Sequence, residues 1–381
     1  MSRHPLNLEK RLENRKKDGA FRTLGGANEL VDFSSNDYLG FSSSEVIFDA
    51  AEEILNYHNL RKNGATGSRL LSGNHKLYAV AEDYLKNFHN TEAALIFNSG
   101  YDANIGLFSS VPQRGDFVFY DELVHASIRD GIKMSNAKPY SFRHNNLEDL
   151  KSKIGRLETK NSAVFIVTES VFSMDGDSPE LKSLSNYASE NNFFLIVDEA
   201  HATGVFGQKG EGLVQELGLE HAVFARIVTF GKGMGCHGAA ILGSNILKDY
   251  LINFCRSFIF TTALPPHAVA TILSAYRNLA NIDLHHLERL KSNINYFKDQ
   301  LKLQDLESRF IASNSAIQSC IIPGNTEVKS AAEDLQKKGF SVKPILSPTI
   351  PKGKERLRFC LHSFNSEEEI QKVLKSLSKI I

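Results

Sequence analysis

The sequence has few cysteines, no excess of either charge and no long apolar run. Its four cysteines are widely spaced and form no CxxC pair, so neither a zinc site nor a disulfide framework is predicted, and a reducing compartment fits best. Lys+Arg and Asp+Glu both number 44, which leaves no long-range field to attract nucleic acid or an anionic membrane. No apolar stretch reaches transmembrane length and residues 1–17 contain no apolar signal segment, so we expect a cytoplasmic protein.

Short apolar segments alternate with segments of helical length through the middle of the chain. The helical segments include 148–157 and 179–190, and Ser178 before Pro179 is typical of a helix start. Short apolar runs flanked by Gly, Asp or Asn are typical of buried parallel strands. The expected strands cover 94–97, 117–120, 163–168, 193–197, 226–229 and 239–242. This alternation predicts an α/β fold with a mainly parallel central sheet.

The pattern changes toward the C-terminus. Residues 270–301 form a long, mostly helical stretch, and the Pro-rich segment 343–352 is predicted to be an ordered loop. Strand-like segments at 316–322 and 357–361 around a helix-like segment at 327–338 predict a smaller α+β domain. We therefore divide the chain into an N-terminal arm (1–43), a large domain (44–277) and a small C-terminal domain (278–381), joined by a long helix.

Two of the expected strands end in residues that carry chemistry. The strand at 193–197 runs into Asp198 and His201, and open α/β sheets place ligand-binding groups at such carboxyl ends. Asp198 alone could equally cap the next turn. The strand at 226–229 runs into Lys232 between two glycines, which is either a solvated loop charge, a phosphate contact or a partly buried lysine suited to covalent catalysis.

A third strand end points to a phosphate. The strand at 94–97 is followed by a turn into a helix at Gly100 and Tyr101, whose free amides could bind a phosphate. Together with Asp198, His201 and Lys232, this arrangement resembles the fold-type I enzymes that depend on pyridoxal 5'-phosphate (PLP), as in aspartate aminotransferase. The resemblance implies that Lys232 forms a Schiff base with PLP.

Five further segments make the resemblance closer. They cover 33–40, 64–69, 121–127, 168–177 and 260–266, and the match runs nearly from end to end. The sequence resembles the α-oxoamine synthases, which are PLP-dependent acyltransferases that join an amino acid to an acyl thioester with loss of carbon dioxide. The family also implies a homodimer with shared active sites, in which Thr262 reaches the phosphate of the neighbouring subunit's cofactor.

The resemblance assigns roles to individual residues, with Lys232, His125, Asp198 and His201 as the catalytic set. Asp198 pairs with the pyridine nitrogen, which makes the ring an electron sink, and His201 bonds the phenolic oxygen. His125 stacks on the ring, although such a histidine could also be a satisfied core residue. Lys232 removes the Cα proton of the amino acid. The remaining cofactor contacts are Gly100, Tyr101, Ser173 and Thr229, and the amino-acid carboxylate is held by Arg358 and Asn36.

Within the family, the closest resemblance is to the biotin-pathway member, which condenses L-alanine with pimeloyl-CoA or a pimeloyl-carrier protein. Arg22 and Thr349 fall on substrate-binding positions of that member. Leu346 stands where an arginine is common, which leaves the acyl chain open. The alternatives are a ketobutyrate ligase, an aminolevulinate synthase or a serine palmitoyltransferase. A catalytically silent partner subunit is disfavoured by the presence of Lys232, and a nucleotide-binding protein by the lack of a GxGxxG or P-loop motif.

Overall fold

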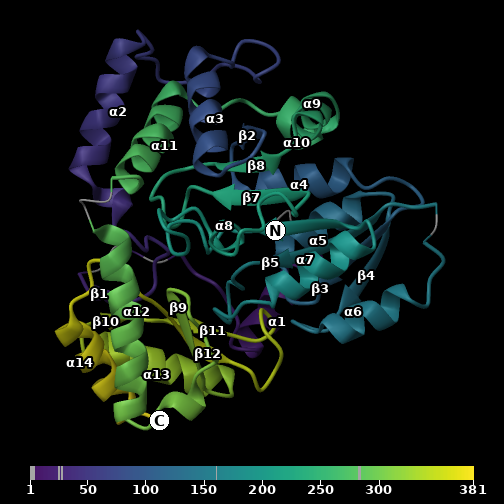
Figure 1. The fold of residues 1–381 in the computed structure, drawn as a ribbon. Helices are drawn as coiled ribbons and strands as arrows, with labels where there is room; N and C mark the ends of the chain where they lie inside the picture. Colours follow the sequence, from purple (N-terminus) through teal and green to yellow (C-terminus); the bar gives the residue numbers. More distant parts are fainter. Residues whose placement is uncertain (1–4, 25, 27–28, 160, 282–284) are drawn as a thin grey trace. The chain divides into compact units, whose positions relative to one another are not determined.

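The computed structural model describes residues 5–24, 26, 29–159, 161–281 and 285–381. It divides into two compact units, and each is described by itself (Figure 1). Unit 1 comprises Met1–Ser35, Met174–Gly176 and Ser292–Ile381, and unit 2 comprises Asn36–Ser173 and Asp177–Lys291. The division at residues 43/44 and 277/278 that we drew from the sequence stays a prediction.

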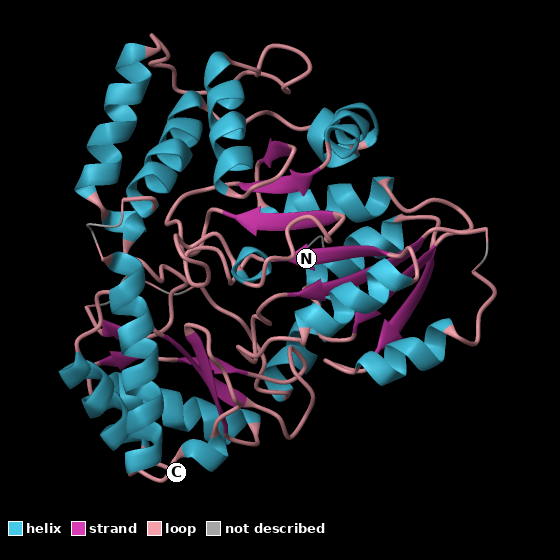
Figure 2. Cartoon of the chain, viewed as in Figure 1, coloured by secondary structure: helices cyan, strands magenta, loops and turns pink. Residues whose placement is uncertain are grey.

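Unit 2 is built on a seven-stranded sheet in the order β2-β8-β7-β6-β5-β3-β4 (Figure 2). Neighbouring strands from β7 to β4 are parallel, whereas β8 is antiparallel to both β7 and β2. The bounds are β2 Ala93–Phe97, β3 Phe117–Asp121, β4 Lys138–Phe142, β5 Val164–Glu169, β6 Phe194–Asp198, β7 Ala225–Thr229 and β8 Ala239–Gly243. The predicted α/β fold with a mainly parallel sheet is confirmed.

Helices of unit 2 pack against this sheet and bury most of its strands, including the edge strand β2. All residues of β2, β5 and β7 are buried, which requires cover on both faces of the sheet. Helix α4 packs against α5, and both contribute to the main apolar cluster below the strands. The helices lying wholly in this unit are α2 Glu45–Tyr57, α3 Lys76–Phe88, α4 Gly100–Ser110, α5 Ala126–Met134, α6 Leu147–Ile154, α7 Leu181–Glu190, α8 Leu213–Glu216, α9 Asn245–Phe254, α10 Arg256–Ile259 and α11 Pro266–Leu279.

Unit 1 combines the N-terminal residues with the C-terminal part of the chain. A three-stranded antiparallel sheet has the order β11-β12-β9, and β1 pairs in parallel with β10. The strands are β1 Val31–Asp32, β9 Ile317–Ile321, β10 Phe340–Ser341, β11 Lys343–Ile345 and β12 Arg356–Cys360. The helices are α1 Leu6–Lys17, α13 Asn325–Lys337 and α14 Glu367–Leu377, and α12 His286–Leu303 spans the boundary with unit 2. The predicted α+β character of this region agrees with these elements.

Several sequence-based details are wrong. The parallel orientation fails at β8, because the connection from β7 folds back through bonds from Phe230 to Gly238 and is too short for a crossover. Helix α7 begins at Leu181, not at Pro179, and Ser178 does not cap it. The stretch 270–301, by contrast, is mostly helical as predicted, with α11 and α12.

Four strands were missed, and two of them, β1 and β10, are only two residues long. The other two are longer. Lys138–Phe142 is an edge strand with only one buried residue, and Lys343–Ile345 lies inside the segment expected to be a loop. Both contain a proline, which weakens a strand pattern read from the sequence. Within the described residues, we find no helix that is both long and apolar enough to cross a membrane.

Candidate functional site

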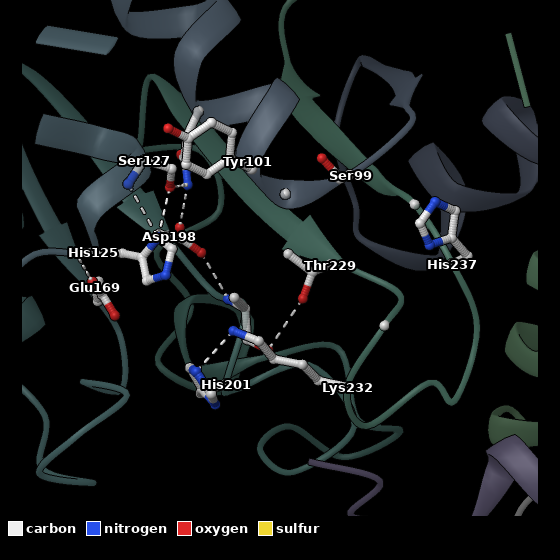
Figure 3. A pocket seen from close by; sticks show the side chains of 15 residues that line it. Ser99, Tyr101, His125, Ser127, Glu169, Asp198, His201, Thr229, Lys232 and His237 are labelled. Carbon is white, nitrogen blue, oxygen red and sulfur yellow. Dashed lines mark hydrogen bonds between the residues drawn. The ribbon is translucent and has the colours of Figure 1, made fainter. Parts of the chain in front are cut away.

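A cavity of about 220 Å³ lies in unit 2, where the strands β5, β6 and β7 end (Figure 3). The N-termini of α4 and α5 contribute the other side of its wall. It is lined by Ser99, Gly100, Tyr101, Asn104, His125, Ser127, Glu169, Asp198, Ala200, His201, Thr229, Gly231, Lys232, His237 and Gly238. The carboxyl ends of parallel strands are the usual ligand-binding edge of an α/β sheet, so the site lies where the fold predicts it.

The lysine predicted to be covalent lies in this cavity beside a histidine. Lys232 Nζ is 2.7 Å from His201 Nε2, and the other ring nitrogen of His201 is 2.6 Å from the hydroxyl of Tyr38. His201 is buried, whereas Lys232 is only partly so. The close approach of the Lys232 loop also requires glycine, because a Cβ on Gly233 would lie 2.7 Å from the carbonyl oxygen of Thr203. The sequence motif therefore brings its lysine and its histidine into direct contact.

Asp198 is buried and held by two hydrogen bonds. Its Oδ1 accepts from the backbone N–H of Ala200 at 2.9 Å, and its Oδ2 accepts from Asn104 Nδ2 at 2.8 Å. Donors of this kind favour the ionised form of a carboxyl group. An ionised carboxylate in the cavity wall is suited to hold a protonated ring nitrogen.

The first turn of α4 closes another part of the cavity. Ser99 caps this helix by accepting from the N–H of Asp102 at 3.0 Å, and the amides of a first helical turn have no partner within the helix. A Cβ on Gly100 would lie 2.5 Å from the Thr229 methyl group, so only glycine allows the helix to approach the end of β7 so closely. The helix N-terminus and the Thr229 hydroxyl together offer donors to an anion.

Two further titratable side chains line the cavity with shifted pKa values. Burial and the positive charge of Lys232 lower the pKa of His125, against the opposing effect of Asp198. Burial and the negative charge of Asp198 raise the pKa of Glu169 well above its usual range. Glu169 accepts a hydrogen bond from the backbone N–H of His125, so the two groups are linked. Both shifts favour the neutral forms at neutral pH.

The chemistry of these residues fits PLP. The cofactor needs an amine for its aldehyde, an acid for its ring nitrogen and N–H donors for its phosphate. Lys232, Asp198 and the first turn of α4 supply these groups around one cavity. The buried Asn104 also has an amide oxygen without a hydrogen-bond partner, as expected for a wall that is completed by a bound group.

Not every predicted residue lines this cavity. Seven predicted site residues do so, namely Gly100, Tyr101, His125, Asp198, His201, Thr229 and Lys232. Glu169, which was not predicted as a site residue, also lines it. Ser173, Asn36 and Thr262 belong to unit 2 but are not among its lining residues. The expected role of Thr262 is in a neighbouring subunit, so its role stays a prediction.

Three predicted substrate residues belong to unit 1. Arg22 Nη2 donates to Thr349 Oγ1 at 3.3 Å, which brings together two positions that are 327 residues apart. Arg358 lies in the middle of β12 and is buried. Their roles in substrate binding stay predictions.

Sequence reasoning missed Asn104 and Ser127 as members of the site. Asn104 lies four residues after Gly100 on α4, and this spacing places both on one face of a helix. Ser127 lies two residues after His125 and accepts from Asn104 at 3.0 Å. Helical spacing from a predicted site residue was therefore the signal that could have found Asn104.

Comparison with known proteins agrees with this geometry. Residues 28–377 match the family described as aminotransferase class I and II. A protein of Emericella nidulans named 8-amino-7-oxononanoate synthase is 40% identical over 364 residues, which cover 91% of this chain and 88% of that protein. A putative 8-amino-7-oxononanoate synthase of Halalkalibacterium halodurans is 36% identical over 385 residues, which cover 98% of this chain and 95% of that protein.

Solved structures give the same result. A serine palmitoyltransferase from S. paucimobilis with bound PLP and myriocin has a TM-score of 0.88 and 29% identity, covering 98% of this chain and 96% of that one. An 8-amino-7-oxononanoate synthase from Francisella tularensis has a TM-score of 0.76 and 30% identity, covering 93% and 98%. The chain belongs to the aminotransferase class I and II family of PLP-dependent enzymes and, within it, to the α-oxoamine synthases.

Proposed function

We propose that this enzyme is an 8-amino-7-oxononanoate synthase, which condenses L-alanine with a pimeloyl thioester. The observation that supports the chemistry is the contact of 2.7 Å between Lys232 Nζ and His201 Nε2 inside the cavity that Asp198 also lines. The relatives that carry this name over most of their length support the choice of substrate. The acyl carrier is coenzyme A or a carrier protein.

Several residues of unit 2 are assigned different roles toward the cofactor. When bound, PLP withdraws electrons from the Cα of the amino acid and makes a proton on that carbon removable. Lys232 would hold the cofactor through Nζ, and the same atom would take the Cα proton of the amino acid. Asp198 holds a proton on the ring nitrogen, and the amides of Gly100 and Tyr101 with the Thr229 hydroxyl bind the phosphate. His201 orients Nζ and bonds the phenolic oxygen.

Further residues are proposed to bind the two substrates. Arg358 and Asn36 bind the carboxylate of alanine, because the planar guanidinium of arginine suits a carboxylate. Arg22 and Thr349, which bond to each other at 3.3 Å, bind the acyl part of the thioester. His125 and Ser173 contact the cofactor. We also propose a homodimer in which Thr262 of one subunit binds the phosphate in the other, and a cytoplasmic location.

One observation favours a second candidate function. The TM-score to the serine palmitoyltransferase is 0.88, against 0.76 for the 8-amino-7-oxononanoate synthase. Leu346 also occupies a position where an arginine would suit the distal carboxylate of a pimeloyl chain. The alternative is an α-oxoamine synthase that joins serine to a long acyl chain.

A thiol-release assay separates these functions. Alanine, glycine and serine are crossed with pimeloyl, acetyl and palmitoyl thioesters of coenzyme A. We expect the largest kcat/KM for alanine with the pimeloyl thioester. A maximum for serine with the palmitoyl thioester supports the second function, and no thiol release with any of the nine pairs contradicts both.

Two variants test the cofactor residues. Lys232→Ala should lose the adduct that borohydride fixes to the protein and should slow turnover at least about 100-fold, since it removes the proposed base. Asp198→Asn should keep bound PLP but slow turnover by a similar factor. Lys209→Ala changes an exposed lysine of the same unit and should leave both properties unchanged. An unchanged rate in Asp198→Asn removes Asp198 from the mechanism.

A further inference from the structure

Asp198 and His125 are joined by a row of hydrogen bonds through two side chains that carry no charge. Asn104 Nδ2 donates both to Asp198 Oδ2, at 2.8 Å, and to Ser127 Oγ, at 3.0 Å. Ser127 Oγ in turn lies 2.7 Å from His125 Nδ1. Figure 3 shows Asp198, His125 and Ser127 near one another in the wall of the cavity, which Asn104 also lines. Asn104 and Ser127 are buried, with exposed fractions of 2% and 0%.

The direction of each bond follows from chemistry. The backbone N–H of Ser127 points at His125 Nδ1, at 3.2 Å, and a backbone N–H can only donate, so Nδ1 is the acceptor. The Ser127 oxygen accepts from the Asn104 amide nitrogen, which can only donate. Since Nδ1 accepts, the bond of 2.7 Å between Nδ1 and the Ser127 hydroxyl is donated by the hydroxyl.

The neutral ring of His125 then carries its proton on Nε2. The two nitrogens of a neutral imidazole divide one proton, so an accepting Nδ1 requires an Nε2–H. Within the part of the chain that the structure describes, Nε2 makes no hydrogen bond, and His125 lines the cavity. Burial and the charges of Lys232 and Arg129 lower the pKa of His125, while Asp198 and Asp130 act in the opposite sense, with a net shift toward the neutral ring.

We propose that Asn104 and Ser127 are positioning residues that hold His125 as the Nε2–H tautomer, so that His125 offers the cavity a hydrogen-bond donor and not a base. This proposal rests on the proposed function for its effect on turnover, but the tautomer itself is a property of the protein without substrate. An N–H donor at this place is suited to a carboxylate or to a carbonyl oxygen that gains negative charge. Proton removal is left to Lys232.

Asn104 has a second effect through the same amide group. Through Ser127 it links the orientation of the His125 ring to Asp198, the residue assigned to the pyridine nitrogen of the cofactor. Asn104 and Asp198 are 94 residues apart in the sequence. Asn104 is one of the two donors that the described residues give to the Asp198 carboxylate, and their only side-chain donor to Ser127 Oγ. Replacing Asn104 removes both of these hydrogen bonds. A change at Asn104 should therefore disturb both ends of the row, whereas a change at Ser127 should disturb His125 alone.

The tautomer can be measured in the apoenzyme. In deuterated protein labelled with 15N-histidine, long-range couplings distinguish Nε2–H from Nδ1–H, and His125→Asn identifies the signal of His125. We expect the wild-type apoenzyme at pH 7.5 to show Nε2–H. In Ser127→Ala and in Asn104→Leu, a fraction of His125 should change to Nδ1–H, with the larger fraction in Ser127→Ala because the hydroxyl donor itself is lost.

Kinetic measurements on the same variants distinguish a positioning role of Ser127 from a general loss of folded protein. With the best substrate pair, kcat should fall about tenfold in Ser127→Ala, as expected for one lost hydrogen bond, while KM for the amino acid stays nearly unchanged. Ser127→Thr keeps the hydroxyl and should restore both the tautomer and kcat. Ser135→Ala, at the other end of α5, is the control and should change neither. If Ser127→Thr does not fold, Asn104→Ala replaces it as the second test, with the same loss expected as in Asn104→Leu.

Two results overturn the proposal. One is a wild-type apoenzyme whose His125 is Nδ1–H or doubly protonated at pH 7.5. The other is a full Nε2–H signal with an unchanged kcat in both Ser127→Ala and Asn104→Leu. If the tautomer changes as expected but no thioester is turned over, the positioning role stands and the proposed function is wrong, so the two failures are distinguishable.

Discussion

Two histidines of unit 2 stand near strand ends and near carboxylates, yet they have opposite properties. His125 follows β3, and His144 follows β4. Both ring nitrogens of His144 contact carboxylates, with Nδ1 3.0 Å from Asp121 Oδ1 and Nε2 2.8 Å from Asp177 Oδ2. The Nδ1 of His125 instead contacts only the uncharged donors of Ser127.

The pKa values follow from these partners. Burial lowers the pKa of His144, but its hydrogen bonds to Asp121 and Asp177 and their charges outweigh burial and raise the pKa to about 9. Burial and the nearby charge of Lys232 lower the pKa of His125. The same side chain is therefore a fixed cation at one strand end and a neutral donor at the other. Direct bonds to carboxylates outweigh burial at His144, whereas burial and the charge of Lys232 outweigh the nearby Asp198 and Asp130 at His125.

The cationic histidine has a structural role. Asp177 lies at the point where the chain returns to unit 2, and its carbonyl oxygen accepts from the N–H of Phe172 at 3.0 Å. The ring of Phe172 meets His144 edge-on, with 4.4 Å between ring centroids. His144 therefore links Phe172 and Asp177 to Asp121 at the end of β3.

The largest effect is expected for His144→Ala. It leaves the fully buried Asp121 without its cationic partner. We therefore expect the free energy of unfolding to fall by about 2 to 3 kcal/mol. This is less than for a fully buried ion pair, because the His144 side chain is 21% exposed. Urea denaturation followed by circular dichroism measures the change. Arg143→Ala removes an exposed ion pair on the neighbouring residue and should cost less than about 1 kcal/mol. Equal losses in both variants would contradict a special role for His144.

The stability that His144 contributes should depend on pH. Its pKa is about 9 in the folded protein and near 6.5 when unfolded, so the contribution is fully present below pH 6.5 and is lost as the pH rises through about 9. The difference in unfolding free energy between wild type and His144→Ala should therefore shrink from pH 6 to pH 10. A difference that stays constant over this range would show that the histidine is not charged in the folded state.

A smaller effect is expected for Asp177→Asn. The amide still accepts a hydrogen bond from the ring but no longer stabilises its charge, so the pKa of His144 should fall and the free energy of unfolding should decrease by about 1 kcal/mol. An NMR titration of His144 and urea denaturation measure the two effects. Asn145→Ala is a useful comparison, because it removes a neutral donor to Asp177 and should leave the pKa of His144 above 6.5.

The smallest effect concerns the neutral histidine. In the apoenzyme, Lys232→Ala removes a positive charge that lowers the pKa of His125, so this pKa should rise but remain below 6.5, since burial is the larger cause. NMR titration of 13C-labelled histidines measures the shift. Lys133→Ala, an exposed lysine on α5, should leave the pKa of His125 where it is in wild type. A fall in the pKa in Lys232→Ala would mean that the charge of Lys232 does not reach the ring.

Much of unit 2 could be predicted because its information is local. Short apolar runs led to β2, β3, β5, β6, β7 and β8, each within about one residue of its observed bounds. The edge strand β4 escaped because four of its five residues are not buried and its pattern lacks a continuous apolar run. The direction of β8 escaped because it depends on how the loop after Thr229 folds back, which apolar composition does not record.

The candidate site also contains residues that local sequence predicted and residues that it did not. Residues that directly follow strands, such as Asp198, His201 and Lys232, were predictable because the ends of parallel strands meet at one edge of a sheet. Asn104 and Ser127 were not, because each lies on a helix and its role appears only through a partner in another element. His144 was not predicted as a charged residue, because the two carboxylate partners that determine its charge are distant in the sequence.

The sequence by itself determined the α/β class, the family and the residue types at the strand ends, since strand patterns and motifs depend on neighbours along the chain. Only the tertiary structure decided which nitrogen of His125 carries the proton and that His144 is charged. These properties depend on hydrogen bonds from residues such as Asp177, which is 33 positions from His144, and Asn104, which is 94 positions from Asp198. Electrostatic interactions depend on distance in space and on burial, and neither can be read from the order of residues along the chain.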